Sequence, residues 1–335
     1  MIDSKHLEEI LQEYTDQKDL YANCEVKIKA LTFDLLKSNS ILVHNIDSRL
    51  KTTESLKGKL LKKSKYKNLS EITDIIGVRI ITYLESDVDK VHEVIETNFT
   101  IDKENSIDKR NLELNQFGYR SLHLVAAVSN IRLDLPEYNN YKGIKFEFQI
   151  RSILQHAWAE IEHDLGYKSK SSLPESTRRS FNRLAALLET ADIEFDRLKT
   201  SLTKYEQEVP ELIKQNPEIV NINQPALEIF TKNNEVFAEI REYVNFSFNS
   251  VFSKEQDSFE DYIDKFKLFD INNIRDLQTF LENNKESYLM FVKKFVNSDI
   301  NKKLKFSLPI FWLQHFLAAK TKNKEQIAEY LGIPG

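Results

Sequence analysis

The chain has 335 residues, of which 47 are basic and 52 acidic, and its formal net charge is −5 at pH 7. This length favours two domains, and the balanced charge excludes a general nucleic-acid coat or a polybasic membrane anchor, so we expect no DNA partner. The single cysteine, Cys24, excludes a disulfide framework and is expected to be a packing residue. A charged N-terminus and the lack of any apolar run of ~20 residues favour a cytoplasmic protein without membrane contact.

The first 200 residues alternate predicted helices with predicted strands. Apolar residues at helical spacing predict one or two helices over residues 4–38, and an isoleucine-rich run predicts a strand over 74–83. Further strands are predicted at 41–46, 121–128 and 144–151, and further helices at 53–63, 86–98 and from Pro174 to about Leu202. Strands mixed with helices predict an α+β fold in which helices flank a mixed β-sheet.

A second domain is expected after a change in composition. Pro210, Pro217 and Pro225 interrupt an acidic, Asn-rich stretch, which predicts a boundary. No glycine occurs from 201 to 331, and this absence favours a compact all-helical domain. We therefore expect a first domain at 1–204, a linker at 205–225 and a helical domain at 226–335.

Residues 146–168 carry the strongest indication of a functional surface. Polar and apolar residues alternate along the predicted strand, which places one polar row on a single face; that row is Lys145, Glu147, Gln149 and Arg151. A second polar row recurs at helical spacing in the following helix, at His156, Glu160, His163 and Tyr167. The two rows are expected to line one cleft.

Three upstream blocks accompany this stretch: SRLKTTESLKGKL at 48–60, DIIGVRIIT at 74–82 and FGYRSLHLV at 117–125. Together with E-x-Q-I-R and the following H-A-W-A-E-x-E-H, they resemble the synthetase domain of the RelA/SpoT family over roughly residues 40–200. The resemblance implies a nucleotidyltransferase-like fold. It also implies a stand-alone alarmone synthetase with a helical C-terminal extension.

Two acidic residues are candidates for both metal binding and catalysis. Pyrophosphate transfer from ATP needs a metal ion to bridge phosphate oxygens, and Mg²⁺ takes one or two carboxylates from a protein. Asp74 stands at the start of an apolar strand, and Glu147 lies within a strand between two phenylalanines, where a charge requires a cleft or a partner. Without context, Asp74 is equally well explained as a strand cap. By resemblance, both match the metal-binding acids of the family, and Glu147 also helps to activate the attacking hydroxyl.

The donor side needs positive charge for the ATP phosphates. A lysine-rich cluster lies at 49–63, and such clusters are usually solvated helix faces. The resemblance selects from it the pattern R-x-K-x-x-x-S-x-x-x-K. The implied ATP-binding residues are Arg49, Lys51, Ser55 and Lys59, together with Arg79.

The acceptor side is expected around Tyr119, because an aromatic ring next to Gly118 can stack on a purine base. By resemblance, the acceptor-binding residues are Tyr119, His123, Gln149, Arg151 and His163. His163 is alternatively a buried structural histidine. Many family members that use guanosine have asparagine where this chain has Phe117, which leaves the identity of the acceptor open.

The reaction implied by the resemblance is ATP + GDP or GTP → AMP + ppGpp or pppGpp, the alarmones of the stringent response, with Mg²⁺ as cofactor. One alternative acceptor is the 3′ end of tRNA, as in toxin-type members, with the helical domain as neutraliser or sensor. Another alternative is a catalytically inactive nucleotide-binding regulator, against which the retained acidic and basic residues argue. The pair His163-Asp164 lies inside the synthetase block and is not expected to support hydrolase activity. The sequence leaves open whether the chain forms a homo-oligomer and whether residues 226–335 bind a protein partner.

Overall fold

The structure is a computed structural model that describes residues 3–63, 66–108, 121–168, 175–253, 258–296 and 302–332. The chain divides into two compact units, Met1–Lys199 and Thr200–Gly335. Helix α7 (Glu175–Gln215) crosses this boundary without interruption. Each unit has its own hydrophobic core, and the two cores share no residue.

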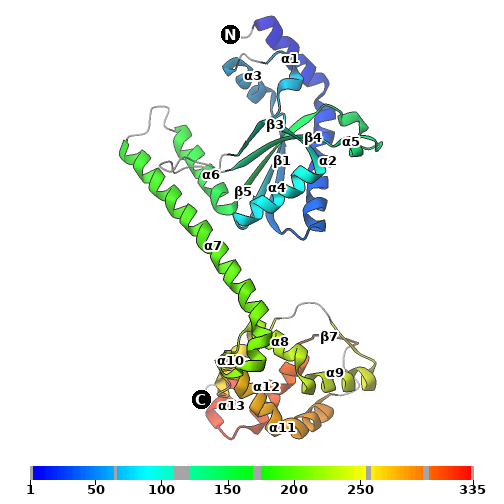
Figure 1. The fold of residues 1–335 in the computed structure, drawn as a ribbon, viewed down its shortest axis with the longest axis vertical. Coiled ribbons are helices and arrows are strands. Elements are labelled where there is room, and N and C mark those ends of the chain that lie inside the picture. Colours follow the sequence, from blue (N-terminus) through cyan, green and yellow to red (C-terminus); the bar gives the residue numbers. More distant parts are fainter. Residues whose placement is uncertain are drawn as a thin grey trace. The chain divides into compact units, whose positions relative to one another are not determined.

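The first unit contains a five-stranded mixed sheet in the order β1-β2-β5-β4-β3 (Figure 1). Only the β2–β5 pair is parallel; the other three neighbouring pairs are antiparallel. The strands are β1 (Val43–Leu50), β2 (Ile76–Thr82), β3 (Phe99–Asp108), β4 (Leu122–Val128) and β5 (Lys145–Ser152). The predicted α+β class with a mixed sheet is confirmed.

Helices cover the apolar face of this sheet. The helices of the first unit are α1 (Ser4–Asp16), α2 (Lys18–Ser38), α3 (Thr53–Lys62), α4 (Ser86–Asn98), α5 (Asn130–Leu133), α6 (Ile153–Lys168) and the first part of α7, with short η1 (Leu69–Glu71) and η2 (Asn139–Tyr141). Phe146, Phe148 and Ile150 of β5 are fully buried beneath α2 and α4 and form the centre of the core. Because strand side chains alternate, their neighbours on β5 point to the opposite face.

The second unit is almost entirely helical. It contains the end of α7, η3 (Pro217–Ile219), α8 (Gln224–Asn233), α9 (Glu235–Phe248), α10 (Glu260–Leu268), α11 (Ile274–Phe295), α12 (Leu308–Lys320) and α13 (Lys324–Leu331). A two-residue parallel pair, β6 (Val251–Phe252) with β7 (Lys303–Leu304), is its only described sheet. The predicted helical class of this region is confirmed.

Residues 205–225, which were predicted to form a linker, contain helical structure. Helix α7 continues to Gln215 with Pro210 inside it. Val209 is completely buried in the core of the second unit, and Tyr205, Leu212 and Ile213 pack against that core. A proline inside a helix costs about 3 kcal/mol, and the burial of these apolar side chains offsets that cost.

Candidate active site

The polar face of the sheet brings together residues from four strands. In the strand register, Gly77 lies opposite Arg49 and Glu147, while Gln149 lies opposite Arg79 and His123. Side chains at paired positions project from the same face, so the polar row of β5 lies beside the predicted donor and acceptor residues. These residues therefore share one face of the sheet, opposite the face that carries the buried phenylalanines.

The donor side is built where α3 begins. Thr52 caps α3 by accepting a hydrogen bond from the Ser55 backbone N–H at 3.2 Å, and its hydroxyl donates to Ser55 Oγ at 3.0 Å. Leu56 and Leu60 anchor the helix in the core, since both are fully buried. Ser55 and Lys59 lie four residues apart, so they share one face of α3.

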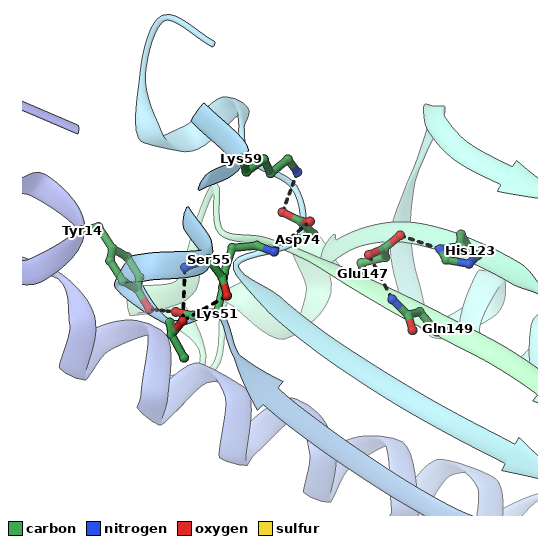
Figure 2. Close-up of polar contacts among 9 residues, drawn as sticks. Tyr14, Lys51, Ser55, Lys59, Asp74, His123, Glu147 and Gln149 are labelled. Atoms are coloured by element: carbon green, nitrogen blue, oxygen red, sulfur yellow. Dashed lines mark hydrogen bonds and ion pairs between the residues drawn. The ribbon is translucent and has the colours of Figure 1, made fainter. Parts of the chain in front are cut away.

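Asp74, in the turn before β2, holds two lysines. Its Oδ1 lies 2.7 Å from Lys59 Nζ and its Oδ2 lies 3.1 Å from Lys51 Nζ (Figure 2). Burial alone would raise the pKa of Asp74, but the hydrogen bonds and charges of Lys59 and Lys51 outweigh burial and lower it. Burial would likewise lower the pKa of Lys59, yet Asp74 raises it overall. Asp74 and Lys59 are therefore both ionised at neutral pH.

Lys51 is also fixed through its backbone, by residues on two other elements. Its N–H donates to the Ile75 carbonyl at 2.8 Å, and its carbonyl accepts a hydrogen bond from the Tyr14 hydroxyl of α1. Tyr14 is only 1% exposed, and burial, then Glu25, raises its pKa, so the hydroxyl remains a donor at neutral pH. Sequence reasoning gave Tyr14 no part in the site.

The acceptor side centres on Glu147. Its Oε1 lies 2.7 Å from His123 Nδ1, and its Oε2 accepts from Gln149 Nε2 at 3.4 Å (Figure 2). The other ring nitrogen of His123 lies 2.8 Å from Ser121 Oγ. Burial alone would raise the pKa of Glu147, and the charge of nearby Asp74 would raise it further. The contacts with His123 and Gln149 outweigh these effects, so the pKa is lowered overall. Glu147 therefore remains a carboxylate.

Helix α6 adds a second ionic cluster at the other end of the polar face. Glu160 lies 3.2 Å from Arg79, 3.9 Å from Arg151 and 3.6 Å from His156. Arg151 is only 2% exposed, so its guanidinium is held within the protein. Burial, then the charges of Arg151 and Arg79, lowers the pKa of His156. Sequence reasoning put Glu160 and His156 on the cleft face and assigned neither a role.

Asp74 and Glu147 fit a hard divalent cation. Figure 2 shows the two carboxylates as neighbours on adjoining elements, and their charges interact. Across the described residues there is no group of three or more His, Cys, Asp or Glu side chains that could enclose a metal. Mg²⁺ does not require one, because it usually keeps several waters and takes one or two protein carboxylates beside the substrate phosphates.

Several predicted acceptor residues lie outside the described part of the chain. Phe117, Gly118 and Tyr119 fall within 109–120, and the side chain of His163 is likewise not described. Their roles remain predictions. The structure describes the remaining predicted site residues, which come from β1, β2, β4, β5, α3, the link between β1 and α3, and the turn before β2: Arg49, Lys51, Ser55, Lys59, Asp74, Arg79, His123, Glu147, Gln149 and Arg151.

Comparison with known proteins matches residues 48–172 to a family model described as "Region found in RelA / SpoT proteins". This range contains all of the predicted site residues. Residues 48–172 therefore match the region that RelA and SpoT proteins share. Residues 200–335 lie outside the match.

Two relatives come from Bacillus subtilis (strain 168). GTP pyrophosphokinase YjbM is 26% identical over 204 residues, covering 59% of this chain and 90% of the relative. GTP pyrophosphokinase YwaC is 29% identical over 171 residues, covering 48% and 75%. Among solved structures, small alarmone synthetase 1 from Bacillus subtilis aligns with a TM-score of 0.49 at 23% identity, over 58% of this chain and 99% of that structure. No helix in the described ranges is long and apolar enough to cross a membrane.

Proposed function

We propose that this chain is a GTP pyrophosphokinase that transfers pyrophosphate from ATP to the 3′-hydroxyl of GDP or GTP. The observation that carries the proposal is the pair of neighbouring carboxylates with contrasting partners. Asp74 lies among lysines, which suits a triphosphate donor, whereas Glu147 lies with a histidine and an amide, which suits a hydroxyl acceptor. Both relatives described above are named GTP pyrophosphokinases.

On the donor side, Lys51, Lys59 and Arg49 would bind the ATP phosphates. Anchoring of Lys51 by Tyr14 and Ile75 places its ammonium before substrate arrives, which reduces the entropy cost of binding. Arg79 would contact the donor from β2. The Arg79 guanidinium forms an ion pair with Glu160, and a phosphate of ATP can replace Glu160 as its partner.

On the acceptor side, Glu147 would accept a hydrogen bond from the 3′-hydroxyl and orient its oxygen toward the β-phosphorus of ATP. A new bond forms between that oxygen and the β-phosphorus, and the bond from the β-phosphorus to the oxygen bridging the α-phosphate breaks, which releases AMP. The hydroxyl proton would pass toward Glu147, whose Oε1 lies beside the His123 ring. Gln149 and Arg151 would contact the acceptor and its phosphates.

Asp74 and Glu147 would hold Mg²⁺, which supplies charge neutralisation on the transferring phosphates when bound. Lys51 and Lys59 also compensate the charge of Asp74.

The test is to incubate purified full-length protein with labelled ATP and, in separate reactions, GDP, GTP and bulk tRNA. Labelled ppGpp or pppGpp in the nucleotide reactions, lost in Glu147→Gln, supports the proposal. Label recovered only in tRNA would replace it with the toxin-type reaction, an alternative that stays open because Phe117 stands where many guanosine-using members have asparagine. Absence of transfer to all three, despite ATP binding, would favour an inactive regulator.

The second unit would be regulatory under either acceptor. We propose that residues 226–335 restrain the synthetase, and that a ligand or protein partner which binds the free form better releases it. A folded truncation after Leu202 should then have higher turnover, or greater toxicity if tRNA is the acceptor. Unchanged turnover and growth effects in that truncation would exclude regulation.

A further inference from the structure

The second unit contains a groove of about 540 Å³, and every residue that lines it belongs to this unit. The groove lies among residues 210–217, 229–236 and 275–285, which come from the end of α7, η3, the junction of α8 and α9, and the first three turns of α11 (Figure 1). Along α11 it extends from Arg275 to Lys285, which is about 15 Å at 1.5 Å per residue. We call it the α11 groove. Its volume is typical of a ligand site.

The deepest part of the α11 groove is apolar. Phe230, Val236 and Leu281 line it, belong to the core of the second unit, and are at most 8% exposed. Two side-chain amides, Asn233 and Gln278, line it as well, and neither has a hydrogen-bond partner within the described ranges. A side-chain amide can both donate and accept, as a peptide group does. The surface therefore suits a ligand that combines apolar side chains with peptide groups.

The end of the groove beside η3 is basic. Lys214 of α7 and Arg275 of α11 line it there. Lys214 Nζ lies 3.6 Å from Glu211, and Arg275 Nη2 lies 4.0 Å from Glu218, but neither glutamate is among the residues that line the groove. All four side chains are more than half exposed, and ion pairs of this kind contribute little to stability. A carboxylate of a ligand can therefore replace either glutamate.

The opposite end of the groove, beside the start of α9, is acidic. Glu235 of α9 and Glu282 of α11 line it, and neither is paired with a cation of the described chain. Lys285 also lines this end, but its Nζ lies 3.2 Å from Glu239, which joins α11 to α9. The two ends of the groove thus carry opposite charge. This arrangement favours a ligand that places a negative group near η3 and a positive group near α9.

The size of the groove distinguishes an extended ligand from a helical one. A helix about 10 Å wide and 15 Å long occupies roughly 1,200 Å³, more than twice the volume available. An extended chain with a cross-section of about 4.8 by 10 Å occupies roughly 700 Å³ over the same length, so most of it fits while its outer side stays in solvent. At about 3.3 Å per residue, 15 Å corresponds to four or five residues.

We propose that the α11 groove binds an extended segment of a partner protein, four or five residues long, with an apolar centre, an acidic residue at the η3 end and a basic residue at the α9 end. The central side chains pack on Phe230 and Leu281, and its peptide groups bond to Asn233 and Gln278. The proposal rests on regulation by the second unit only for its effect on turnover, because binding can be measured without the transfer reaction.

The first test uses acetylated, amidated five-residue peptides and the full-length protein. One pool has aspartate at one end and lysine at the other, in both chain directions, and its three central positions vary over alanine, valine, leucine and phenylalanine. Two matched pools have aspartate or lysine at both ends. Peptides retained with the protein on ultrafiltration are quantified by mass spectrometry. The opposite-charge pool should be retained about 10-fold better than either matched pool. Equal retention of the three pools, or no retention of any, overturns the proposal.

Charge reversal in the groove should then exchange this preference. Lys214→Glu combined with Arg275→Glu should favour the pool with lysine at both ends, and Glu282→Lys should favour the pool with aspartate at both ends. The matched controls are Lys294→Glu and Glu286→Lys, which change exposed residues of α11 that do not line the groove. Misfolding can abolish binding but cannot exchange the preferred charge. An unchanged preference in the groove variants, or the same exchange in the controls, overturns the assignment.

A second test locates the bound peptide on the wild-type protein. The best-retained peptide is made with a benzophenone side chain at its centre, and the full-length protein is irradiated with it in the absence of ATP. Cross-links mapped by mass spectrometry should fall within 210–217, 229–236 or 275–285. A dominant cross-link in the first unit, or elsewhere in the second, overturns the site. Since no step uses transfer activity, a negative result here leaves the proposed reaction intact, and an inactive enzyme leaves this result intact.

Discussion

The proposed donor and acceptor sides of the site each hold a carboxylate, but with different partners. Each must hold a mostly buried carboxylate, with 25% of the Asp74 side chain and 19% of the Glu147 side chain exposed. Asp74 contacts two lysines, whereas Glu147 contacts an imidazole and an amide. We call Asp74 with Lys51 and Lys59 the donor clamp; the proposed acceptor side instead pairs its carboxylate with a histidine and an amide.

The largest effect is expected from removing the acceptor carboxylate. Glu147→Gln keeps the size of the side chain but removes the charge that would orient the hydroxyl and hold Mg²⁺. We expect kcat to fall by about 10²–10⁴-fold, with a much smaller change in ATP binding measured by calorimetry. Asp74→Asn should lose activity similarly and should also weaken ATP binding. Near-wild-type turnover in Glu147→Gln would remove that residue from the catalytic assignment.

The donor clamp is tested by neutralising one of its lysines. Lys59→Gln leaves Asp74 with Lys51 alone, and a hydrogen bond to a charged group contributes about 1.5–3 kcal/mol. We expect kcat/KM for ATP to fall by about 10- to 100-fold with little change in KM for the acceptor. Lys62→Gln, on an exposed position of the same helix, is the control. Equal losses in the two variants would mean that α3 contributes only general positive charge.

The clamp also predicts how stability depends on pH. The pKa of Asp74 is lowered from its ordinary value of 3.8, so its contribution to folding is present above that value. That contribution is lost as the pH falls below 3.8 and through the lower pKa of the folded state. Asp74→Asn should therefore flatten the acid dependence of unfolding of the first unit.

The two units can be monitored separately in this experiment. The chain has two tryptophans, Trp158 in the first unit and Trp312 in the second. A Trp312→Phe background restricts fluorescence to Trp158, and urea titrations at neutral and acidic pH then report the first unit. An acid dependence that is identical with and without Asp74 would show that the lysine pairs do not stabilise the fold.

The smallest effect is expected at Tyr14. Tyr14→Phe removes one neutral hydrogen bond to the Lys51 carbonyl, which contributes about 0.5–1.5 kcal/mol. KM for ATP should rise by about 2- to 10-fold while kcat and the acceptor KM change little. Tyr21→Phe is the control, because its ring lies 6.1 Å from that of Tyr14 and is also buried. A change in melting temperature without a change in KM would reduce Tyr14 to a packing residue.

Local patterns predicted much of this architecture. The alternation along β5 correctly separated the polar face from the core, because strand periodicity directly determines which side chains share a face. Helical spacing likewise predicted α4 and the apolar face of α1. Strand β3 was missed because most of its side chains are exposed on the sheet edge, so FTIDKENSID shows no sustained apolar alternation.

Contacts between distant residues could not be predicted in this way. Glu160 meets Arg79 across 81 positions, and Tyr14 meets Lys51 across 37. Each contact depends on how helices pack on the sheet, which single-sequence periodicity does not specify. The prolines predicted a linker at 205–225, but α7 remains helical through Pro210, where the neighbouring Val209 is fully buried.

Transfer of the β-phosphorus tests the central claim most directly. Protein is incubated with GDP or GTP and with ATP radiolabelled only at the β-phosphorus, and the nucleotides are separated by chromatography. Because the proposed reaction breaks the bond between the α- and β-phosphates, the label should appear in ppGpp or pppGpp while unlabelled AMP accumulates. Label that remains in ATP, or that appears in ADP, would contradict pyrophosphate transfer to a guanosine nucleotide.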